Sequence, residues 1–319
     1  MLHLLVAVVF MSLEPLIRLR DNLTSVVKGK PEAIEATIIA VLAGGSILME
    51  DAPGTGKTTL ARALAQSLAL SFQRIQFTPD LLPGDVLGGS IFLPNEGRFS
   101  FRPGPIFCQV LLADEINRAS PRTQSALLEA MGEQQVTIEG QRHRLEQPFF
   151  VLATQNPVEF QGTYPLPEAQ LDRFLALISL GYPDAETEVE ILFSQQTAQP
   201  LDAIGPVMTA EELLTWRRRV QETPVSKEVA RYAVDLVRET RTDARVRLGA
   251  SPRASLMLFR AAQAAAVFSG RTYATPDDVQ RTARFVLPHR LQLAGQGRAA
   301  SAARRLVIED VIARVPVPV

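Results

Sequence analysis

The chain has one cysteine and three histidines in 319 residues, and this scarcity excludes several kinds of site. A single cysteine, Cys108, cannot form an internal disulfide, so the sequence carries no disulfide framework. Its apolar neighbours predict a buried thiol, and a reducing cytoplasm is the expected location. The histidines, His3, His143 and His289, have no partners at metal-ligand spacing, so no transition-metal site is expected.

Charge of one sign and long hydrophobic runs are also scarce. The formal net charge is −1 at pH 7, so no global field draws the chain to nucleic acid or to an anionic membrane. Residues 1–10 are apolar but too short to span a bilayer, and they lack the basic region and cleavage site of a secretory signal. Neither nucleic-acid binding nor membrane insertion is therefore expected. Residues 1–10 read as an extension, and Met11 is a candidate for the true start.

A local basic patch is the remaining way to bind a polyanion. The three arginines at 217–219 are adjacent and fan around a helix, so a solvated surface is the favoured interpretation. The arginines within 241–247 fit a nucleic-acid site and a subunit interface equally well.

The composition is that of a globular protein, with 46% hydrophobic and 21% charged residues, and its length favours two domains. Five apolar runs, separated by helical patterns, lack the alternation of half-exposed strands. They span residues 46–50, 72–77, 110–113, 149–153 and 174–180. Runs that are apolar on both faces predict an α/β fold with a five-stranded parallel sheet covered by helices on each side.

Two further stretches read as β-hairpins inserted into this α/β core. Residues 84–105 place a turn at 95–97 between short strand-like runs, and residues 134–147 place one around 139–141. After Pro183 the strand patterns disappear.

Helix N-caps mark the second half of the chain and predict a small all-α domain. The caps are Thr209, Ser226, Ser251 and Thr275. The expected domains are an α/β core over residues 11–183, a linker over 184–208 and a helical domain over 209–319.

Residues 50–59 follow the first apolar run and precede a helical pattern, which is the order of a phosphate-binding loop. Gly54 and Gly56 can adopt backbone angles closed to other residues, so that successive N–H groups point at phosphate oxygens. Lys57 would reach the β- and γ-phosphates, and Thr58 would bind Mg²⁺. The nucleotide-binding residues predicted in the loop are Asp51, Ala52, Pro53, Gly54, Thr55, Gly56, Lys57, Thr58 and Thr59.

The strict pattern G-x-x-x-x-G-K-[ST] is not met, because Asp51 occupies its first position. A carboxylate close to phosphates is unfavourable unless it points away from them. We therefore expect Asp51 to face outward or to pair with a nearby basic group. The alternative to a nucleotide site is a glycine-rich turn that binds nothing.

Two carboxylates, Asp114 and Glu115, follow the third apolar run at the sheet edge where ligands of parallel sheets bind. Asp114 would hold Mg²⁺ through water, and Glu115 would polarise an attacking water. After the next run, the amide of Asn156 suits the orientation of that water or of a γ-phosphate oxygen. An Asn-Pro turn at a strand end is equally compatible with this residue alone.

Taken together, these motifs resemble those of an AAA+ ATPase, and the MoxR group matches them best. They are Val27 to Gly29, the phosphate loop, Asp114 to Arg118, Ala153 to Pro157, Pro167 to Phe174 and Gly249 to Arg253. The resemblance covers both predicted domains, and the group tolerates an aspartate at position 51.

The resemblance implies ATP and Mg²⁺ as ligands and assigns further residues. Val27 and Gly29 would line the adenine pocket, and Asn156 would be the first sensor. Arg173 would be an arginine finger that reaches into the neighbouring subunit's site, and Arg253 would be the second sensor, on the helical lid. For an isolated arginine, a surface ion pair would be the default interpretation.

A finger supplied in trans leaves each site incomplete in a monomer, so a homo-oligomeric ring, most often a hexamer, is expected. The resemblance also implies chaperone-like remodelling, or insertion of a cofactor, on a protein client, with a partner that carries a von Willebrand factor A domain. The hairpin inserts would line the pore or a face of the ring.

Three alternatives stay open. Within the same architecture, the chain could be a nucleic-acid motor or the ATPase subunit of a magnesium chelatase. The low net charge and the lack of an aromatic and basic stripe in the inserts disfavour the motor. From another class, it could be a nucleotide-dependent switch with little turnover, which Glu115 disfavours.

Overall fold

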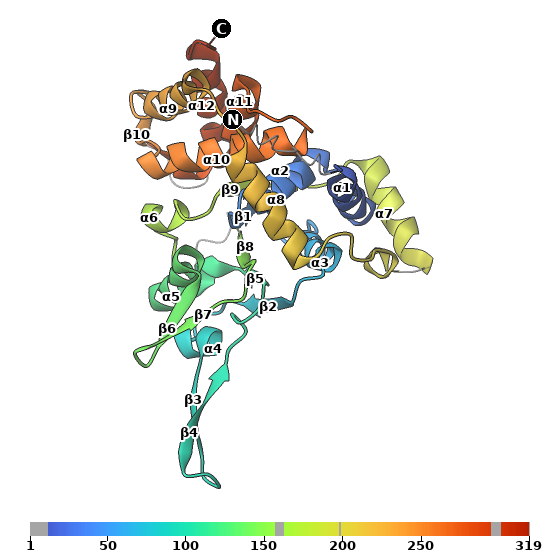
Figure 1. Ribbon diagram of the computed structural model, residues 1–319, viewed down its shortest axis with the longest axis vertical. Helices are drawn as coiled ribbons and strands as arrows, with labels where there is room; N and C mark the ends of the chain where they lie inside the picture. The colour runs from blue at the N-terminus through green and yellow to red at the C-terminus, as the bar shows by residue number, and fades with distance from the viewer. Residues whose placement is uncertain (1–11, 157–162, 198, 295–300, 319) are drawn as a thin grey trace, which may run out of the picture.

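The computed structural model describes residues 12–156, 163–197, 199–294 and 301–318 (Figure 1). The predicted extension over residues 1–10, the proposed start at Met11 and Pro157 lie outside these ranges. No helix of the described part is long and apolar enough to cross a membrane.

The predicted five-stranded parallel sheet forms the centre of the core, and the structure gives its strand order as β2-β5-β8-β1-β9. Its strands are β1 (Ile47–Glu50), β2 (Phe72–Gln76), β5 (Val110–Asp114), β8 (Phe150–Gln155) and β9 (Ala176–Ile178). Successive residues point to opposite faces, so Ile47 and Met49 join one hydrophobic cluster while Leu48 joins the other.

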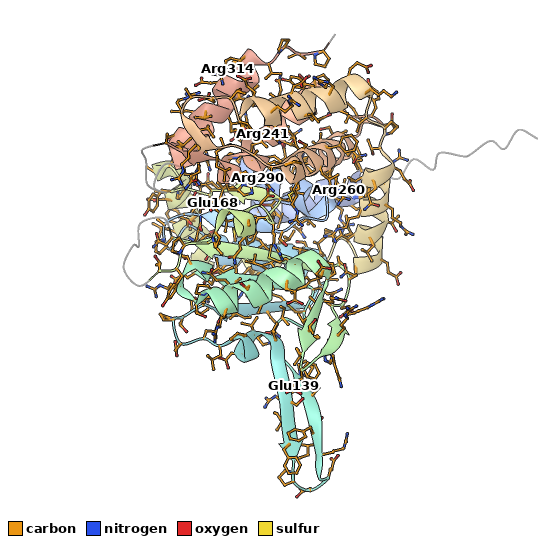
Figure 2. All side chains as sticks on the ribbon, turned by 90° about the vertical axis from the view of Figure 1, so that its left-hand side faces the viewer. Glu139, Glu168, Arg241, Arg260, Arg290 and Arg314 are labelled. Carbon is orange, nitrogen blue, oxygen red and sulfur yellow. The ribbon has the colours of Figure 1, made fainter. Side chains whose placement is uncertain are left out.

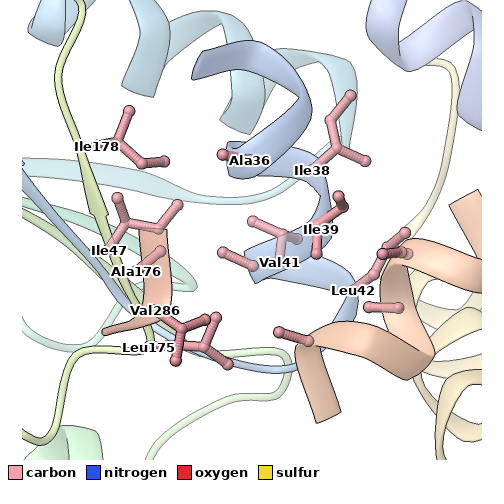
Figure 3. Close-up of a cluster of buried hydrophobic side chains, with 14 of the residues drawn as sticks. Ala36, Ile38, Ile39, Val41, Leu42, Ile47, Leu175, Ala176, Ile178 and Val286 are labelled. Atoms are coloured by element: carbon pink, nitrogen blue, oxygen red, sulfur yellow. The ribbon is translucent and has the colours of Figure 1, made fainter. Parts of the chain in front are cut away.

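Helices cover both faces of the sheet. The cluster around Ile47 contains α1 (Glu14–Val26), α2 (Pro31–Leu42) and α3 (Lys57–Ser67), and the cluster around Leu48 contains α5 (Pro121–Glu133) and Leu171 of α6 (Glu168–Leu171). Nine of the twelve residues of α2 are buried, because the sheet covers one side of this helix and the second domain covers the other. Figure 3 shows side chains of α2 gathered with Ile47, Ala176 and Val286.

The edge strand β2 departs from the expectation of strands apolar on both faces. Only Ile75 of its five residues is buried, and Arg74 and Gln76 are exposed. An edge strand has no neighbour on one side, so polar side chains there keep their hydration. Arg74 and Gln76 are two residues apart and therefore share a face.

Both predicted hairpins are present. One pairs β3 (Gly88–Leu93) with β4 (Arg98–Pro103) after the short helix α4 (Pro83–Leu87), and the other pairs β6 (Gln135–Ile138) with β7 (Gln141–Arg144). The β3-β4 hairpin projects far from the body of the molecule (Figure 1).

The β6-β7 hairpin contacts the base of the β3-β4 hairpin. The Phe101 ring stacks on His143 at 4.3 Å between centroids, and Ser90 donates to the Glu139 carboxylate at 2.6 Å. Glu139 is labelled beside the β3-β4 hairpin in Figure 2. The two inserts therefore form one unit.

The second domain is helical and its predicted N-caps are present, with Thr209, Ser226 and Ser251 each accepting from a backbone N–H of its own helix. Its helices are α8 (Ala210–Glu222), α9 (Lys227–Glu239), α10 (Pro252–Phe268), α11 (Pro276–Val286) and α12 (Ser301–Arg314), with the turn η3 (Pro288–Arg290) after α11. The segment expected as a linker contains α7 (Ala185–Thr197) and η2 (Pro200–Ala203).

One feature of this domain contradicts the expectation that strands end at residue 183. A short antiparallel pair, β10 (Val246–Leu248) and β11 (Gln292–Leu293), joins segments far apart in the chain. Runs of two and three residues are too short for a local pattern to predict.

Arg217 contradicts the expectation that the arginines at 217–219 form a solvated surface. Its Nε donates to the carbonyl of Val41 at the end of α2 at 2.9 Å, and its guanidinium lies 5.7 Å from the Phe150 ring centroid. Burial lowers the pKa of Arg217 to about 10. Arg217 therefore packs the second domain onto the core, at a helix end that favours positive charge.

A buried ion pair joins the last helix to the sheet. Arg304 of α12 donates to the two carboxylate oxygens of Glu50 at 3.0 and 3.4 Å, and Gln155 donates to the same carboxylate at 3.0 Å. The side chains of Arg304 and Glu50 are 10% and 6% exposed. Since Glu50 ends β1 and Gln155 ends β8, one carboxylate connects the helical domain to two central strands.

We expect Arg304→Ala to lower the free energy of unfolding by about 3–5 kcal/mol, because the Glu50 carboxylate would stay buried without its counter-charge. Arg305→Ala is the matched control, since Arg305 is the next residue of α12 and is exposed. Urea unfolding followed by circular dichroism measures the difference. Equal stability of the two variants would contradict a role for the pair in holding the domains together.

Candidate functional site

A cleft of about 380 Å³ lies at the carboxyl edge of the sheet, where β1, β5 and β8 end and α3 begins. It brings together the predicted loop, both predicted carboxylates and Asn156. Its lining residues are Asp51, Pro53, Gly54, Thr55, Gly56, Lys57, Thr58, Thr59, Arg74, Gln76, Asp114, Glu115, Thr154, Gln155 and Asn156. Among the other predicted site residues, Ala52, Val27, Gly29, Arg173 and Arg253 do not line it.

The loop has the backbone geometry of an anion cradle. Gly54 and Gly56 have φ angles of 81° and 94°, a region that favours glycine. A Cβ at either position would meet no atom within 4 Å, so both glycines are required by backbone conformation and the space beside them is open. Gly56 is also the N-cap of α3 and supplies no side-chain acceptor to the first N–H groups of the helix. These donors fit a phosphate group.

Lys57 is held over the loop. Its Nζ donates to the carbonyls of Asp51 at 3.1 Å and Ala52 at 2.6 Å. Burial lowers the pKa of Lys57 from its ordinary value, while the carboxylates of Asp51, Asp114 and Glu115 act in the opposite direction. These three acids therefore favour the charged form that binds phosphate.

The Asp51 side chain neither faces outward nor pairs with a basic group, so that expectation is wrong. Its carboxylate is 5% exposed and accepts from the Ser179 hydroxyl at 2.7 Å and from the N–H groups of Leu180 and Gly181 at 2.7 and 2.9 Å. These partners follow β9 and lead toward α7. Asp51 thus ties the phosphate loop to the point where the chain leaves the sheet.

Thr154 organises the two carboxylates at the end of β5. Its hydroxyl donates to Asp114 Oδ1 at 2.6 Å and accepts from the N–H of Glu115 at 2.8 Å. Glu115 has a φ of 56°, which is uncommon outside glycine, and strained residues of this kind gather at functional sites. The β5-β8 pairing therefore sets the direction of Glu115.

Basic and amide groups balance the acids. Arg74 donates to Asp114 Oδ2 at 2.6 Å, and Glu115 Oε2 lies 2.8 Å from Gln76 Nε2 and 3.2 Å from Arg118 Nε. Each Asp114 oxygen accepts bonds in this network but can accept more, which leaves capacity for metal-bound water. Thr58, Asp114 and the cradle fit a Mg²⁺-bound nucleotide.

Arg74, Gln76, Thr154 and Gln155 are site residues that sequence reasoning missed. The run 72–77 is apolar at Phe72, Ile75 and Phe77 but polar at its other three positions. Arg74 and Gln76 are two residues apart and so lie on the same face of a strand, and this spacing is the signal that could have identified them. Thr154 and Gln155 belong to the quoted motif before Asn156, and only the neighbouring strands reveal their contacts.

Four residues with implied roles lie outside the cleft. Val27 is buried, and Gly29 packs against Thr187 of α7. Arg173 donates a short hydrogen bond to the carbonyl of Leu128 in α5, and Arg253 is exposed in the first turn of α10. The structure does not bring these residues together with the phosphate loop of their own chain.

Asp51→Gly would restore the strict loop pattern, yet we expect it to weaken the protein. The change removes three hydrogen bonds to a charged group and leaves the N–H groups of Leu180 and Gly181 without this acceptor, a loss of about 1.5–3 kcal/mol of stability. Urea unfolding measures this loss, and titration with a fluorescent ATP analogue should show weaker binding. Asp51→Asn, which keeps the shape, should lose less. Tighter binding by the glycine variant would contradict this account of Asp51.

Comparison with known proteins agrees with this geometry. Residues 46–176 match the model of the ATPase family associated with various cellular activities (AAA), and residues 238–314 match that of the AAA lid domain. The chain is 46% identical to the protein YeaC of Bacillus subtilis over 94% of its own length and 93% of that protein. It is 38% identical to "Chaperone MoxR1" of Mycobacterium tuberculosis over 92% of its length and 80% of that protein.

A solved structure of a protein from Cytophaga hutchinsonii superposes on this chain with a TM-score of 0.86. The two are 38% identical, and the match covers 96% of each chain. The similarity therefore spans the sheet, the cleft and the helical domain.

Proposed function

Because the chain belongs to the MoxR group of AAA+ ATPases, we propose that it hydrolyses ATP as a ring of like subunits and uses the cycle to remodel a protein client. The observation that carries this proposal is the cleft that gathers the phosphate loop, Asp114, Glu115 and Asn156 at one sheet edge. Six subunits, a partner with a von Willebrand factor A domain and cofactor insertion into the client stay predictions from the family resemblance.

Each group in the cleft has a role in hydrolysis. The loop N–H groups and Lys57 would bind the β- and γ-phosphates, while Thr58 and Asp114 would hold Mg²⁺, which neutralises phosphate charge when bound. Glu115 would accept a proton from the water that attacks the γ-phosphorus. The bond from this phosphorus to the β,γ-bridging oxygen breaks, which yields ADP and inorganic phosphate. Asn156 would orient the water.

The charge needed at the γ-phosphate is divided between subunits. Arg173 and Arg253 lie outside the cleft of their own chain. We propose that both act on the cleft of the neighbouring subunit, where a guanidinium stabilises the charge that develops on the transferred phosphoryl group. An assembled ring, and not a monomer, then holds a complete site.

Val27 and Gly29 keep their proposed role as adenine contacts. Lys30 donates to the carbonyl of Tyr182 at 2.7 Å, and Asp51 holds residues 180 and 181. The turn at residues 27–30 and the phosphate loop therefore both contact one short segment. A nucleotide whose phosphates bind the loop would have its base on this side.

The β3-β4 hairpin is the proposed surface for the client. Phe92 and Phe99 near its tip are 50% and 70% exposed, and their ring centroids lie 5.2 Å apart. Ile91 is also exposed. An exposed apolar cluster on a projecting element is typical of an interaction site, and it fits an apolar segment of an unfolded protein.

We expect the double change of Phe92 and Phe99 to serine to weaken binding of an unfolded protein roughly tenfold or more, because aromatic anchors dominate such contacts. The probe is reduced, carboxymethylated α-lactalbumin, followed by fluorescence anisotropy with ATP in a Glu115→Gln background. Arg98→Ser at the same tip is the control. Unchanged affinity in the double variant would contradict the assignment of the client surface.

For the catalytic site, we expect Glu115→Gln to assemble with ATP but to hydrolyse it roughly 10²- to 10⁴-fold more slowly, since the general base is lost. Arg173→Ala rings should also be inactive. Rings that mix the two variants should regain activity wherever an Arg173→Ala cleft meets an intact finger. Phosphate release measures hydrolysis, and light scattering coupled to size exclusion measures assembly. Arg18→Ala, an exposed change on α1, is the control.

The outcomes separate the candidate functions. Mixtures that never recover activity would contradict a finger supplied in trans. A persistent monomer that binds ATP would favour the nucleotide-dependent switch. Stimulation of hydrolysis by single-stranded DNA would favour the motor. The structure corrects the expectation that the inserts lack aromatic and basic residues, because Arg98, Phe99 and Arg102 of β4 are exposed.

A further inference from the structure

A short chain of hydrogen bonds connects the two arginines that lie outside the cleft. The N–H of Arg253 donates to Ser251 Oγ at 3.1 Å, and this hydroxyl donates to Asp172 Oδ2 at 2.8 Å. Asp172 directly precedes Arg173, and Ser251 is the N-cap of α10. The start of the main lid helix is therefore bonded to the segment that carries the proposed finger.

A buried arginine occupies the second oxygen of Asp172. Arg290 of η3 donates its Nε to Asp172 Oδ1 at 2.9 Å, and its side chain is 1% exposed. Its Nη atoms donate to the carbonyls of Asp172 at 3.3 Å, Phe174 at 2.5 Å and Leu175 at 3.4 Å. One lid side chain thus holds the backbone on both sides of Arg173. Figure 2 shows Arg290 on the same side of the molecule as Glu168 of α6, a helix that contacts η3.

The core holds the finger from the other side. The Arg173 guanidinium donates to the carbonyl of Leu128, and a Cβ at Gly132 would lie 3.2 Å from its Nη1. Position 132 therefore has little room for a larger residue while Arg173 is in this place. The backbone of Arg173 depends on the lid, and its side chain depends on α5.

The charges make Asp172 the centre of this arrangement. Burial lowers the pKa of Arg290 to about 10; the Asp172 carboxylate opposes this shift, and Arg253 adds to it. Arg290 is therefore a cation at neutral pH in a buried place, and Asp172 is the acid that faces it. Without that acid, the buried charge of Arg290 would lack a counter-charge and would still be repelled by Arg253.

We propose that Asp172 is a positioning residue that holds Arg173 and Arg253 in a fixed relation, so that both reach the neighbouring subunit's nucleotide as one unit. This inference rests on the proposed function, because it needs a finger that acts in trans. In physical terms, a shift of α10 would also move residues 172–175, because Ser251 at its N-terminus is bonded to Asp172. Asp172 itself touches no substrate.

The test is Asp172→Asn, which keeps the size of the side chain and an acceptor for Ser251 but removes the charge that faces Arg290. We expect the affinity for a fluorescent ATP analogue to stay unchanged, because the subunit's own cleft is intact. We expect kcat to fall roughly 10- to 100-fold, as for a displaced catalytic group. Asp277→Asn, an exposed acid in the same domain, is the matched control.

Mixed rings separate this role from a general structural one. Asp172→Asn subunits have a sound cleft, so mixing them with Glu115→Gln subunits, which have a sound finger, should restore hydrolysis. A second pair of variants tests the Ser251 hydroxyl, which links Arg253 to Asp172. Ser251→Ala should lower kcat, and Ser251→Thr, which keeps both the N-cap and the hydroxyl, should retain it. Thermal unfolding ensures that all variants are compared while folded.

An unchanged kcat in Asp172→Asn, or a loss that Glu115→Gln subunits do not complement, would overturn the positioning role. The proposed function fails separately. If Arg173→Ala rings stay active, the finger assignment is wrong whatever Asp172 does. If Arg173→Ala is inactive while Asp172→Asn is active, the finger stands and only the positioning role is lost.

Discussion

Two successive buried carboxylates at the end of β1 set the arrangement of everything around the phosphate loop. Glu50 accepts from Arg304 of the last helix and from Gln155 of β8, and Asp51 accepts from the three residues that follow β9. Buried acids are unfavourable unless donors surround them. Since these donors come from the lid, from β8 and from the segment after β9, the loop that follows is coupled to all three.

The balance of charges in the cleft is consistent with the separate location of Arg173 and Arg253. The cleft already contains Lys57 and Arg74 facing Asp114 and Glu115, so its own chain nearly balances its acids. A bound triphosphate adds negative charge that this set does not match. Arg173 and Arg253 lie on another part of the surface, where a second subunit can use them. The proposal that hydrolysis depends on assembly rests on this distribution.

Packing contacts are continuous from the finger to the proposed client surface. Arg173 is bonded to the carbonyl of Leu128 in α5, and β6 follows α5 directly. The β6-β7 hairpin contacts the β3-β4 hairpin through the stack of His143 on Phe101. If the proposed ring forms, a change at Arg173 would have a continuous path of packed elements to the projecting hairpin.

Much of the site could be predicted from short stretches of sequence. The glycines of the loop, the acids after β5, the helix caps and the hairpin turns all act through neighbouring residues, so local patterns were enough to find them. The strands β1, β5, β8 and β9 were also found, because burial on both faces leaves an apolar run, whereas β2 has only one buried residue and its polar residues face solvent.

The tertiary structure alone decided which distant groups meet. Contacts between segments far apart in the chain include the bond of Arg74 to Asp114, the β10-β11 pair, the bond of Arg217 to Val41, the partners of Asp51 and the bonds of Asp172. A local pattern shows that a charged or polar side chain exists. It does not show which group pairs with that side chain, because the partner comes from a distant segment. The two groups meet only when the elements of the sheet and the lid pack together.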